Sequence, residues 1–303
     1  MGTWGPGLYS CDLASDLRAL VATLARLPLP DEELVDLAAA TDPQVANDPG
    51  DHDHPVFWIA LADQCARHGI ESPRARALAL AAIDDGADLA ACRRLGMSED
   101  DAARRQAELR EVRERIAVAA GSAPPPRKTL KKPQPLLLEP GVCVVYPVGE
   151  SMLRLPWRFH AINPYLANPG KLGWKRDGWG AALILEAGHA FGFLAWYRPA
   201  VVLHHKETRP TLDDVREARI VGGTGAGTCS PLRFKRMKIE RIGRLALDAS
   251  VVAGARWSSS GSFSPQGAAI ADVCMSNRLA DPPPDGAPAV RELLLDTEGA
   301  SRD

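Results

Sequence analysis

Apolar side chains recur at helical spacing through the first third of the chain. A first helix is predicted from leucine and valine residues that return every three or four positions, and Pro28 and Pro30 end it. Asp31 is placed to cap a short second helix. The apolar positions are Leu13, Leu17, Leu20, Val21, Leu24 and Leu27 in the first helix and Leu34 and Leu37 in the second.

Two further helices are predicted from their start and stop signals. Pro55 stands in the first turn of an apolar helix that Gly69 ends. Ser72 and Pro73 open another helix, rich in alanine and leucine, which closes near Gly86. Short helices that follow one another at this spacing predict a helical domain.

A longer and more charged helix is predicted after residue 98. Ser98 and Asp101 form a capping-box pattern at its start. Its apolar stripe holds only Leu109, Val112 and Ile116. We therefore expect a surface helix with a narrow contact face.

From residue 137 onward the hydrophobic period is that of strands. Gly141 opens a strongly apolar run, and two apolar segments around Gly188 predict a hairpin with its turn at that glycine. Pro199 separates this hairpin from another short strand. The predicted strand segments are 141–148, 181–187, 191–197, 200–205 and 232–247.

Helices followed by strands, without βαβ alternation, are typical of an α+β protein. We expect an N-terminal helical domain over residues 1–120, followed over 137–280 by a mainly antiparallel β domain that forms a small barrel or a curled sheet. Thr211 and Asp214 make a second capping pattern, which predicts one short helix over 211–219. A doubly wound nucleotide-binding sheet is not expected, because it requires the alternation that is missing.

Charge is distributed unevenly and supports these boundaries. Residues 1–120 hold 12 Arg, no Lys and 21 Asp and Glu, a net charge of -9. Residues 121–136 carry +4, are rich in proline and predict a semi-rigid linker, while 137–303 carry +3. The final stretch, 281–303, contains DPPPDG and is expected to be a loose tail around one short segment, RELLL.

Composition restricts the class of protein. The chain is 46% hydrophobic and 24% charged, as in folded globular proteins. It has no apolar run of eighteen residues, and its opening lacks the basic and apolar regions of a secretory leader. We therefore expect a cytoplasmic protein with no membrane partner. The six cysteines form no CxxC pair, so they are expected to be reduced and mostly buried.

The opening residues, MGTWGPGLYSCD, carry an uncommon pattern of glycines around a tryptophan. This pattern resembles a bacterial family of unknown function whose members begin Met-Gly-x-Trp-Gly-x-Gly. The resemblance covers about the first third of the chain, and it implies a partner in a bacterial conflict or stress locus rather than an enzyme. Where the family has roughly Asn-Asp before the first helix, this chain has Cys11 followed by Asp12. The matching positions are Gly2, Trp4, Gly5, Gly7 and Asp12.

The same motif has a structural interpretation that needs no function. Its glycines permit a tight backbone path, and Trp4 is placed to fill the helical core. The functional alternative is that Trp4 and Tyr9 form part of a contact surface. The second half, through GVCVVYP and DGWGA, is similar to β-rich immunity proteins of toxin–immunity systems. That similarity implies a protein partner, a toxin.

Asp51, His52 and His54 suggest a metal site, since carboxylates and imidazoles are ligands of zinc, manganese and iron. They would serve a metal-dependent hydrolase. His68 lies at the far end of the same predicted helix and is too distant to complete the site. The alternative is a solvated acidic turn in which Asp53 caps the helix.

The region 157–198 is the most informative for binding, because four of the seven tryptophans fall within it. Two of them stand in the polar, glycine-rich segment GKLGWKRDGWGA, which predicts a loop. Aromatic and arginine side chains on loops are typical of binding hot spots. The alternative is that both tryptophans fold back over the sheet. The candidate partner-binding residues are Trp174, Lys175, Arg176, Asp177, Trp179 and Arg198.

The remaining motifs favour other chemistries only weakly. The run GGTGAGTCS lacks the lysine of a phosphate-binding loop, and no cysteine or serine stands in a nucleophile signature. The basic segment 232–247 could meet nucleic acid, but the sequence pI of about 6.4 argues against general affinity for it. The sequence thus predicts a non-enzymatic interaction protein without a cofactor, of the immunity-inhibitor kind. The alternatives are a metal-dependent hydrolase and a nucleic-acid-associated regulator. The oligomeric state stays open.

Overall fold

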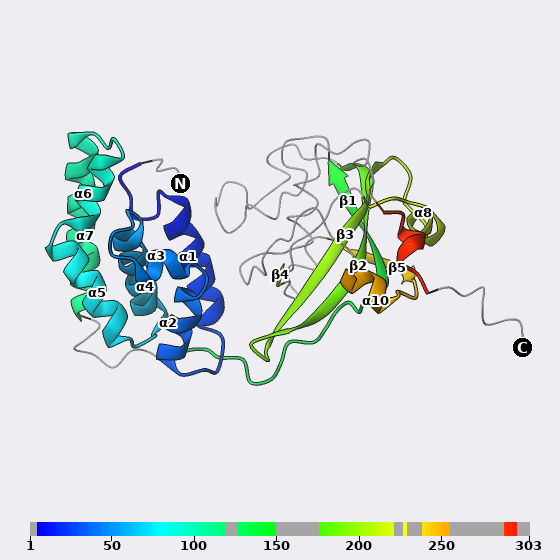
Figure 1. Cartoon of the computed structure of the whole chain (residues 1–303), viewed down its shortest axis with the longest axis horizontal. Helices are drawn as coiled ribbons and strands as arrows, with labels where there is room; N and C mark the ends of the chain where they lie inside the picture. Colours follow the sequence, from blue (N-terminus) through cyan, green and yellow to red (C-terminus); the bar gives the residue numbers. More distant parts are fainter. Residues whose placement is uncertain are drawn as a thin grey trace, which may run out of the picture. The chain divides into compact units, whose positions relative to one another are not determined.

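The structure is a computed structural model that describes residues 5–118, 126–149, 176–220, 227–228, 238–254 and 288–295. The chain divides into two compact units, Met1–Lys131 and Lys132–Asp303. The first unit is helical and the second holds the sheet (Figure 1). This arrangement confirms the predicted α+β class with its N-terminal helical part.

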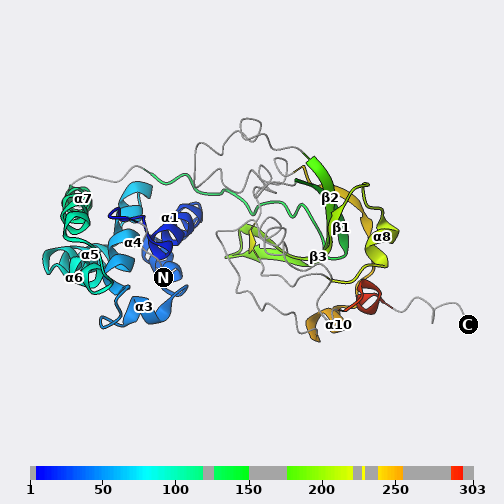
Figure 2. The same cartoon turned by 90° about the horizontal axis from the view of Figure 1, so that it is seen from above.

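The helical unit is built around one apolar helix, α4. Every residue of α4 from Pro55 to Cys65 is buried, and α1, α5 and α7 pack against it. A helix that is buried on all sides over about three turns belongs at the centre of a bundle. Figures 1 and 2 show it among the other helices. The helices of this unit are α1 (Asp12–Leu24), α2 (Asp31–Ala39), α3 (Pro43–Asn47), α4 (His54–His68), α5 (Pro73–Asp84), α6 (Ala87–Arg94) and α7 (Glu99–Val118).

The helix ends follow the predicted signals with two differences. Gly69 ends α4 with a φ of 69°, and the Ser72 hydroxyl accepts a hydrogen bond from the amide of Ala75 at the start of α5. Asp53 occupies the N-cap position of α4, but its side chain makes no capping bond, so the predicted cap is wrong. The second helix begins at Asp31 itself, with Pro30 in the N-cap position.

The β unit holds a five-stranded antiparallel sheet in the order β4-β3-β2-β1-β5. Among the described residues, the first and last strands of this order do not pair, so the sheet is open and does not form the barrel that was one of the two predicted arrangements. Its strands are β1 (Val142–Gly149), β2 (Arg176–Ala190), β3 (Leu194–Lys206), β4 (Gly227–Thr228) and β5 (Glu240–Arg244). The unit also contains α8 (Leu212–Arg216), α10 (Ala249–Gly254) and the 3-10 helix η5 (Val290–Leu293). The capping box of Thr211 and Asp214 is formed at α8, as predicted.

The hairpin of β2 and β3 turns at Phe191 and Gly192, not at Gly188. These two residues have φ of 51° and 72°, and the amide of Phe193 donates to the carbonyl of Ala190. Positive φ at both central residues is the mark of a type I′ turn. Gly188 lies inside β2, where an added Cβ would come 3.0 Å from the indole nitrogen of Trp196.

Strand β3 runs through Pro199 without a break. Pro199 pairs with Ile184, and the register shifts between Ile184 and Glu186. Proline lacks the amide that a regular ladder needs, and a bulge is one of the places that tolerates it. The two short strands predicted on either side of Pro199 are therefore one strand of 13 residues.

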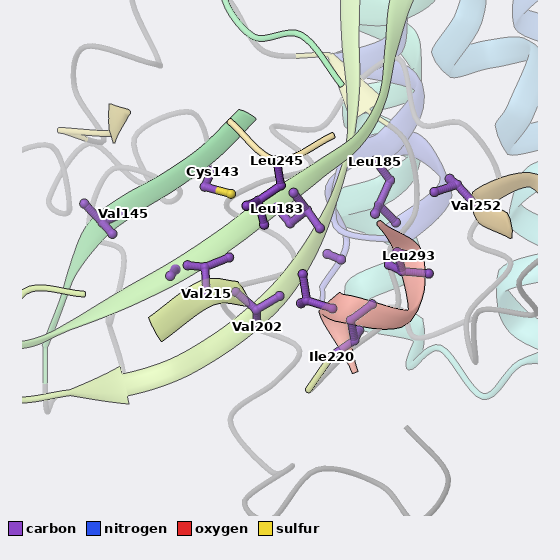
Figure 3. Close-up of a cluster of buried hydrophobic side chains, with 13 residues drawn as sticks. Cys143, Val145, Leu183, Leu185, Val202, Val215, Ile220, Leu245, Val252 and Leu293 are labelled. Atoms are coloured by element: carbon purple, nitrogen blue, oxygen red, sulfur yellow. The ribbon is translucent and has the colours of Figure 1, made fainter. Parts of the chain in front are cut away.

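The sheet is buried on both faces. On β1, Val142, Val144 and Tyr146 face one core, while Cys143 and Val145 face the other. Burial on both sides explains why the sequence of β1 is continuously apolar. Figure 3 shows the second core, where Leu183, Val202, Val215 and Leu293 lie close together.

The C-terminal strap, residues 288–295, closes the second core. Val290 and Leu293 of η5 are 0% and 1% exposed. The backbone of the strap bonds to two other segments, through Val290 to Ala218, Ile220 to Pro288, Asp248 to Leu293 and Leu295 to Ala246. The prediction of a loose tail is therefore wrong for residues 288–290, and the short RELLL segment predicted within that tail places Leu293 in the core. Residues 281–287 and 296–303 lie outside the described part of the chain.

The described part of the predicted linker packs against each unit. Arg127 donates hydrogen bonds to the carbonyls of Ala25, Leu27 and Leu29 after α1, and pairs with Asp31 at 2.8 Å. A guanidinium at the end of a helix compensates its unbonded carbonyls. In the β unit, Gln134 has three contacts, with the carbonyl of Phe193, the amide of Ala195 and the ring of His189.

Candidate binding surfaces

The segment predicted as a binding loop is in part a strand. Trp174 and Lys175 lie outside the described residues, and Arg176 and Asp177 begin β2. Trp179 is also in β2, paired with Lys206, so the prediction that it stands in a loop is wrong.

Trp179 lies in a cluster of alternating charges at one end of the sheet. Its half-buried side chain packs against the second core, and the guanidinium carbon of Arg209 lies 6.0 Å from its ring centroid. Nε and Nη2 of Arg209 both donate to Oε2 of Glu240, at 3.1 and 2.8 Å. Nζ of Lys206 lies 2.5 Å from Oδ1 of Asp214. We refer to Trp179, Lys206, Arg209, Asp214 and Glu240 as the Trp179 cluster.

The charges of this cluster are set by hydrogen bonds. The bond from Lys206, followed by bonds from the backbone and hydroxyl of Thr211, lowers the pKa of Asp214 to about 2. The carboxylate is thus ionised at all ordinary pH values and holds Lys206 in place. The cluster therefore presents fixed charges beside an aromatic ring.

Arg198 does not join the Trp179 cluster. It is opposite Glu186 in the register, and its Nη1 lies 3.3 Å from that carboxylate. Glu186 is seven positions from Trp179 along β2, or roughly 23 Å at the rise of a strand. Trp179 and Arg198 are the predicted partner-binding residues whose side chains the structure describes, and they therefore do not form one site.

The predicted metal trio is only partly assembled. Asp51 and His52 do lie together, with Asp53 as the third member of the group, and the three residues have potential ligand atoms within 4.8 Å of one another. The two ring nitrogens of His52 lie 3.6 Å from Asp51 and 3.4 Å from Asp53. His54 is elsewhere, with Nδ1 2.7 Å from the carbonyl of Val45. Burial raises the pKa of Asp53. The donor set would suit a divalent ion, with all ligands from consecutive residues of one partly exposed turn.

The cysteines with described side chains are not activated. Burial raises the pKa of the Cys11 thiol, and raises those of Cys65, Cys92 and Cys143 to about 12, 11 and 12. A thiol with such a pKa is protonated at neutral pH and is a poor nucleophile. These residues act as small apolar side chains, and Cys65 and Cys143 are buried.

Buried charges of α6 and α7 hold the opening motif of the chain. Arg105 and Asp88 form a bidentate ion pair with both distances 2.8 Å, and their side chains are 3% and 2% exposed. Arg105 also donates to the carbonyl of Gly7 at 2.7 Å. The amide of Leu8 donates to Glu108 at 2.8 Å. The motif therefore has a structural role at Gly7 and Leu8, while Trp4 lies outside the described residues.

A second network is centred on Asp63, whose carboxylate is fully buried in α4. Its Oδ2 accepts from the Tyr9 hydroxyl at 2.5 Å and from Nε of Arg67 at 2.7 Å. Its Oδ1 accepts from Nε of Arg115 at 3.0 Å, and Gln64 donates to the Tyr9 hydroxyl. Burial acts to raise the pKa of Asp63, but the bonds from Tyr9, Arg67 and Arg115 outweigh it and hold the pKa below its ordinary value.

Three arginines meet at this network. Arg67 and Arg115 contact Asp63, and the guanidinium carbon of Arg18 lies 5.1 Å from the centroid of the Tyr9 ring. We refer to Arg18, Arg67 and Arg115 as the arginine cluster. This cluster was not predicted from the sequence. The available signal was Asp63 itself, one acidic residue within the apolar run of α4.

Comparison of the chain with protein-family models, curated proteins and solved structures finds no match. Among the helices that the structure describes, none has both the length and the apolar character needed to span a membrane.

Proposed function

We propose that this chain is a cytoplasmic interaction protein, and that the Trp179 cluster contacts its protein partner. The observation that carries the proposal is the arrangement of Arg209 beside the half-buried ring of Trp179. Tryptophan and arginine are the residues most enriched in binding hot spots, because they combine a large apolar surface with directed hydrogen bonds.

The cluster is organised before any partner binds. The ring of Trp179 packs against the second core, and Arg209 forms an ion pair with Glu240. A side chain that is already ordered loses less conformational entropy on association, so more of its contact energy appears as affinity. The side chain of Arg209 is still 48% exposed, which leaves it within reach of a partner.

The test is site-specific photo-cross-linking with the full chain in cells of its source. A benzophenone amino acid replaces Arg209 in one variant and Arg216 in the control, since Arg216 of α8 is 44% exposed and also pairs with a carboxylate. We expect one protein to cross-link through position 209 and not through 216. In the absence of the cross-linker, Arg209→Gln should reduce co-purification of that protein about fivefold. Equal cross-linking from both positions, or co-purification that Arg209→Gln leaves unchanged, contradicts the proposal.

The narrower proposal is that the protein is an immunity-type inhibitor of a toxin. It is supported by the resemblance of the opening motif and of the β-rich second half. The cross-linked protein should then be an enzyme that harms the cell, and an equimolar amount of the purified chain should abolish its activity. A partner that is harmless when expressed alone contradicts the narrower proposal and leaves the broader one standing.

A further inference from the structure

A second surface, in the helical unit, is arranged to bind anions. The arginine cluster draws its members from three helices, Arg18 from α1, Arg67 from α4 and Arg115 from α7. Arg18 lies beside the ring of Tyr9, whose hydroxyl donates to the buried carboxylate of Asp63, and that carboxylate accepts from Arg67 and Arg115. This surface is separate from the Trp179 cluster and does not depend on the function proposed for it.

The cluster carries more positive charge than its own contacts neutralise. Within the described part of the chain, Asp63 is the carboxylate that pairs with Arg67 and with Arg115, and Arg18 pairs with none. The cluster thus holds three positive charges and one carboxylate, that of Asp63, which pairs with two of them. Arg67 bonds to Asp63 through Nε and also hydrogen-bonds to the side chain of Tyr9, so only part of its five N–H donors is used and the rest can meet another acceptor.

The buried carboxylate of Asp63 fixes the positions of two exposed arginine side chains. The side chains of Arg67 and Arg115 are 48% and 37% exposed, whereas that of Asp63 is 0% exposed. A buried carboxylate costs free energy unless charged donors satisfy it, so Asp63 and the two arginines constrain one another. The partner of this surface therefore meets donors whose positions are already fixed.

We propose that the arginine cluster docks an acidic segment of another protein, whose carboxylates bind the free donors of Arg18, Arg67 and Arg115. The planar guanidinium matches a carboxylate with two parallel hydrogen bonds. The surrounding unit favours a short acidic segment over a long polyanion. Residues 1–120 carry a net charge of -9, which repels a nucleic acid that would extend beyond the cluster.

The test measures fluorescence anisotropy of a labelled hexaglutamate peptide with the full chain at low salt. Arg18→Gln is the informative variant, because Arg18 contacts the Tyr9 ring and not Asp63. Arg110→Gln is the control, an exposed arginine of α7 with the same change of charge. Five positions separate it from Arg115, or about 140° around the helix. We expect Arg18→Gln to weaken binding about fivefold and Arg110→Gln to change it less than twofold.

Three results would overturn the proposal. The first is a wild-type chain that binds hexaglutamate no better than hexaglutamine. The second is an equal loss in the two variants, which would mean that net charge and not this surface attracts the peptide. The third is a single-stranded oligonucleotide that binds more tightly than the peptide and loses its binding in Arg18→Gln, which would assign the surface to nucleic acid. Thermal unfolding of each variant confirms that Arg18→Gln remains folded.

Discussion

The turn at Phe191 and Gly192 places two consecutive residues in the left-handed region of backbone space. Glycine adopts that region freely, whereas a residue with a Cβ adopts it at a cost. Gly192 has open space around its α carbon, so its side-chain position meets no neighbour within 4 Å. The reason for glycine at this position is therefore conformational and not steric.

We predict that Gly192→Ala destabilises the β unit by about 1 kcal/mol, because alanine must adopt a positive φ there. Gly254→Ala is the matched control. Gly254 ends α10, also has nothing within 4 Å and has no positive φ, so alanine should be neutral or stabilise by up to about 1 kcal/mol. Urea unfolding measures both changes. A similar loss of stability in the two variants would refute the conformational explanation.

The sequence around Asp63 does not reveal which residues bond to its carboxylate. The helix that carries it was predicted from its apolar pattern, and an acidic residue in that pattern signals a buried partner. The partners are Tyr9, Arg67 and Arg115, and two of them lie 54 and 52 positions away. Only the packing of α1, α4 and α7 brings them together, so the arginine cluster could not be predicted from the sequence.

At the scale of elements, the helices with strong start and stop signals were predictable. The apolar run between Pro55 and Gly69 became α4, and Ser72 opened α5. The short α3 and α6 were missed, since five and eight residues are too few to show a period. Gly188 was misread as a turn, because a glycine that admits the Trp196 ring within a strand has the same sequence signal as a turn glycine.

The C-terminal strap acts as a structural element of the β unit. We predict that Leu293→Ala destabilises this unit by about 3 kcal/mol, because a leucine that is 1% exposed leaves a cavity in the second core. Leu295→Ala is the control, since Leu295 lies two residues further in the same strap and is 49% exposed. Leu295→Ala should lower the free energy of unfolding by less than about 0.5 kcal/mol. Equal effects in urea unfolding would mean that the strap does not rest on the core in solution.

At the scale of the whole molecule, the charge asymmetry of the sequence coincides with a real division. The acidic first part forms one unit and the strand-rich second part another, and the contacts divide them between Lys131 and Lys132. That point falls inside the segment predicted as a linker. Its proline and lysine composition indicated a connection, but it could not indicate that Arg127 and Gln134 bond to the units on either side.

The division predicts two separable unfolding transitions in calorimetry of the full chain. Arg127→Ala removes hydrogen bonds to three carbonyls and an ion pair with Asp31 within the helical unit. We expect it to cost about 2 kcal/mol and to lower the transition of that unit by about 5 °C. Lys128→Ala, at the exposed neighbouring residue, should leave both transitions in place. The transition lowered by Leu293→Ala identifies the β unit, and Arg127→Ala must not lower that one. If the two variants move the same transition, the units unfold as one cooperative body and the division at Lys131 has no thermodynamic meaning.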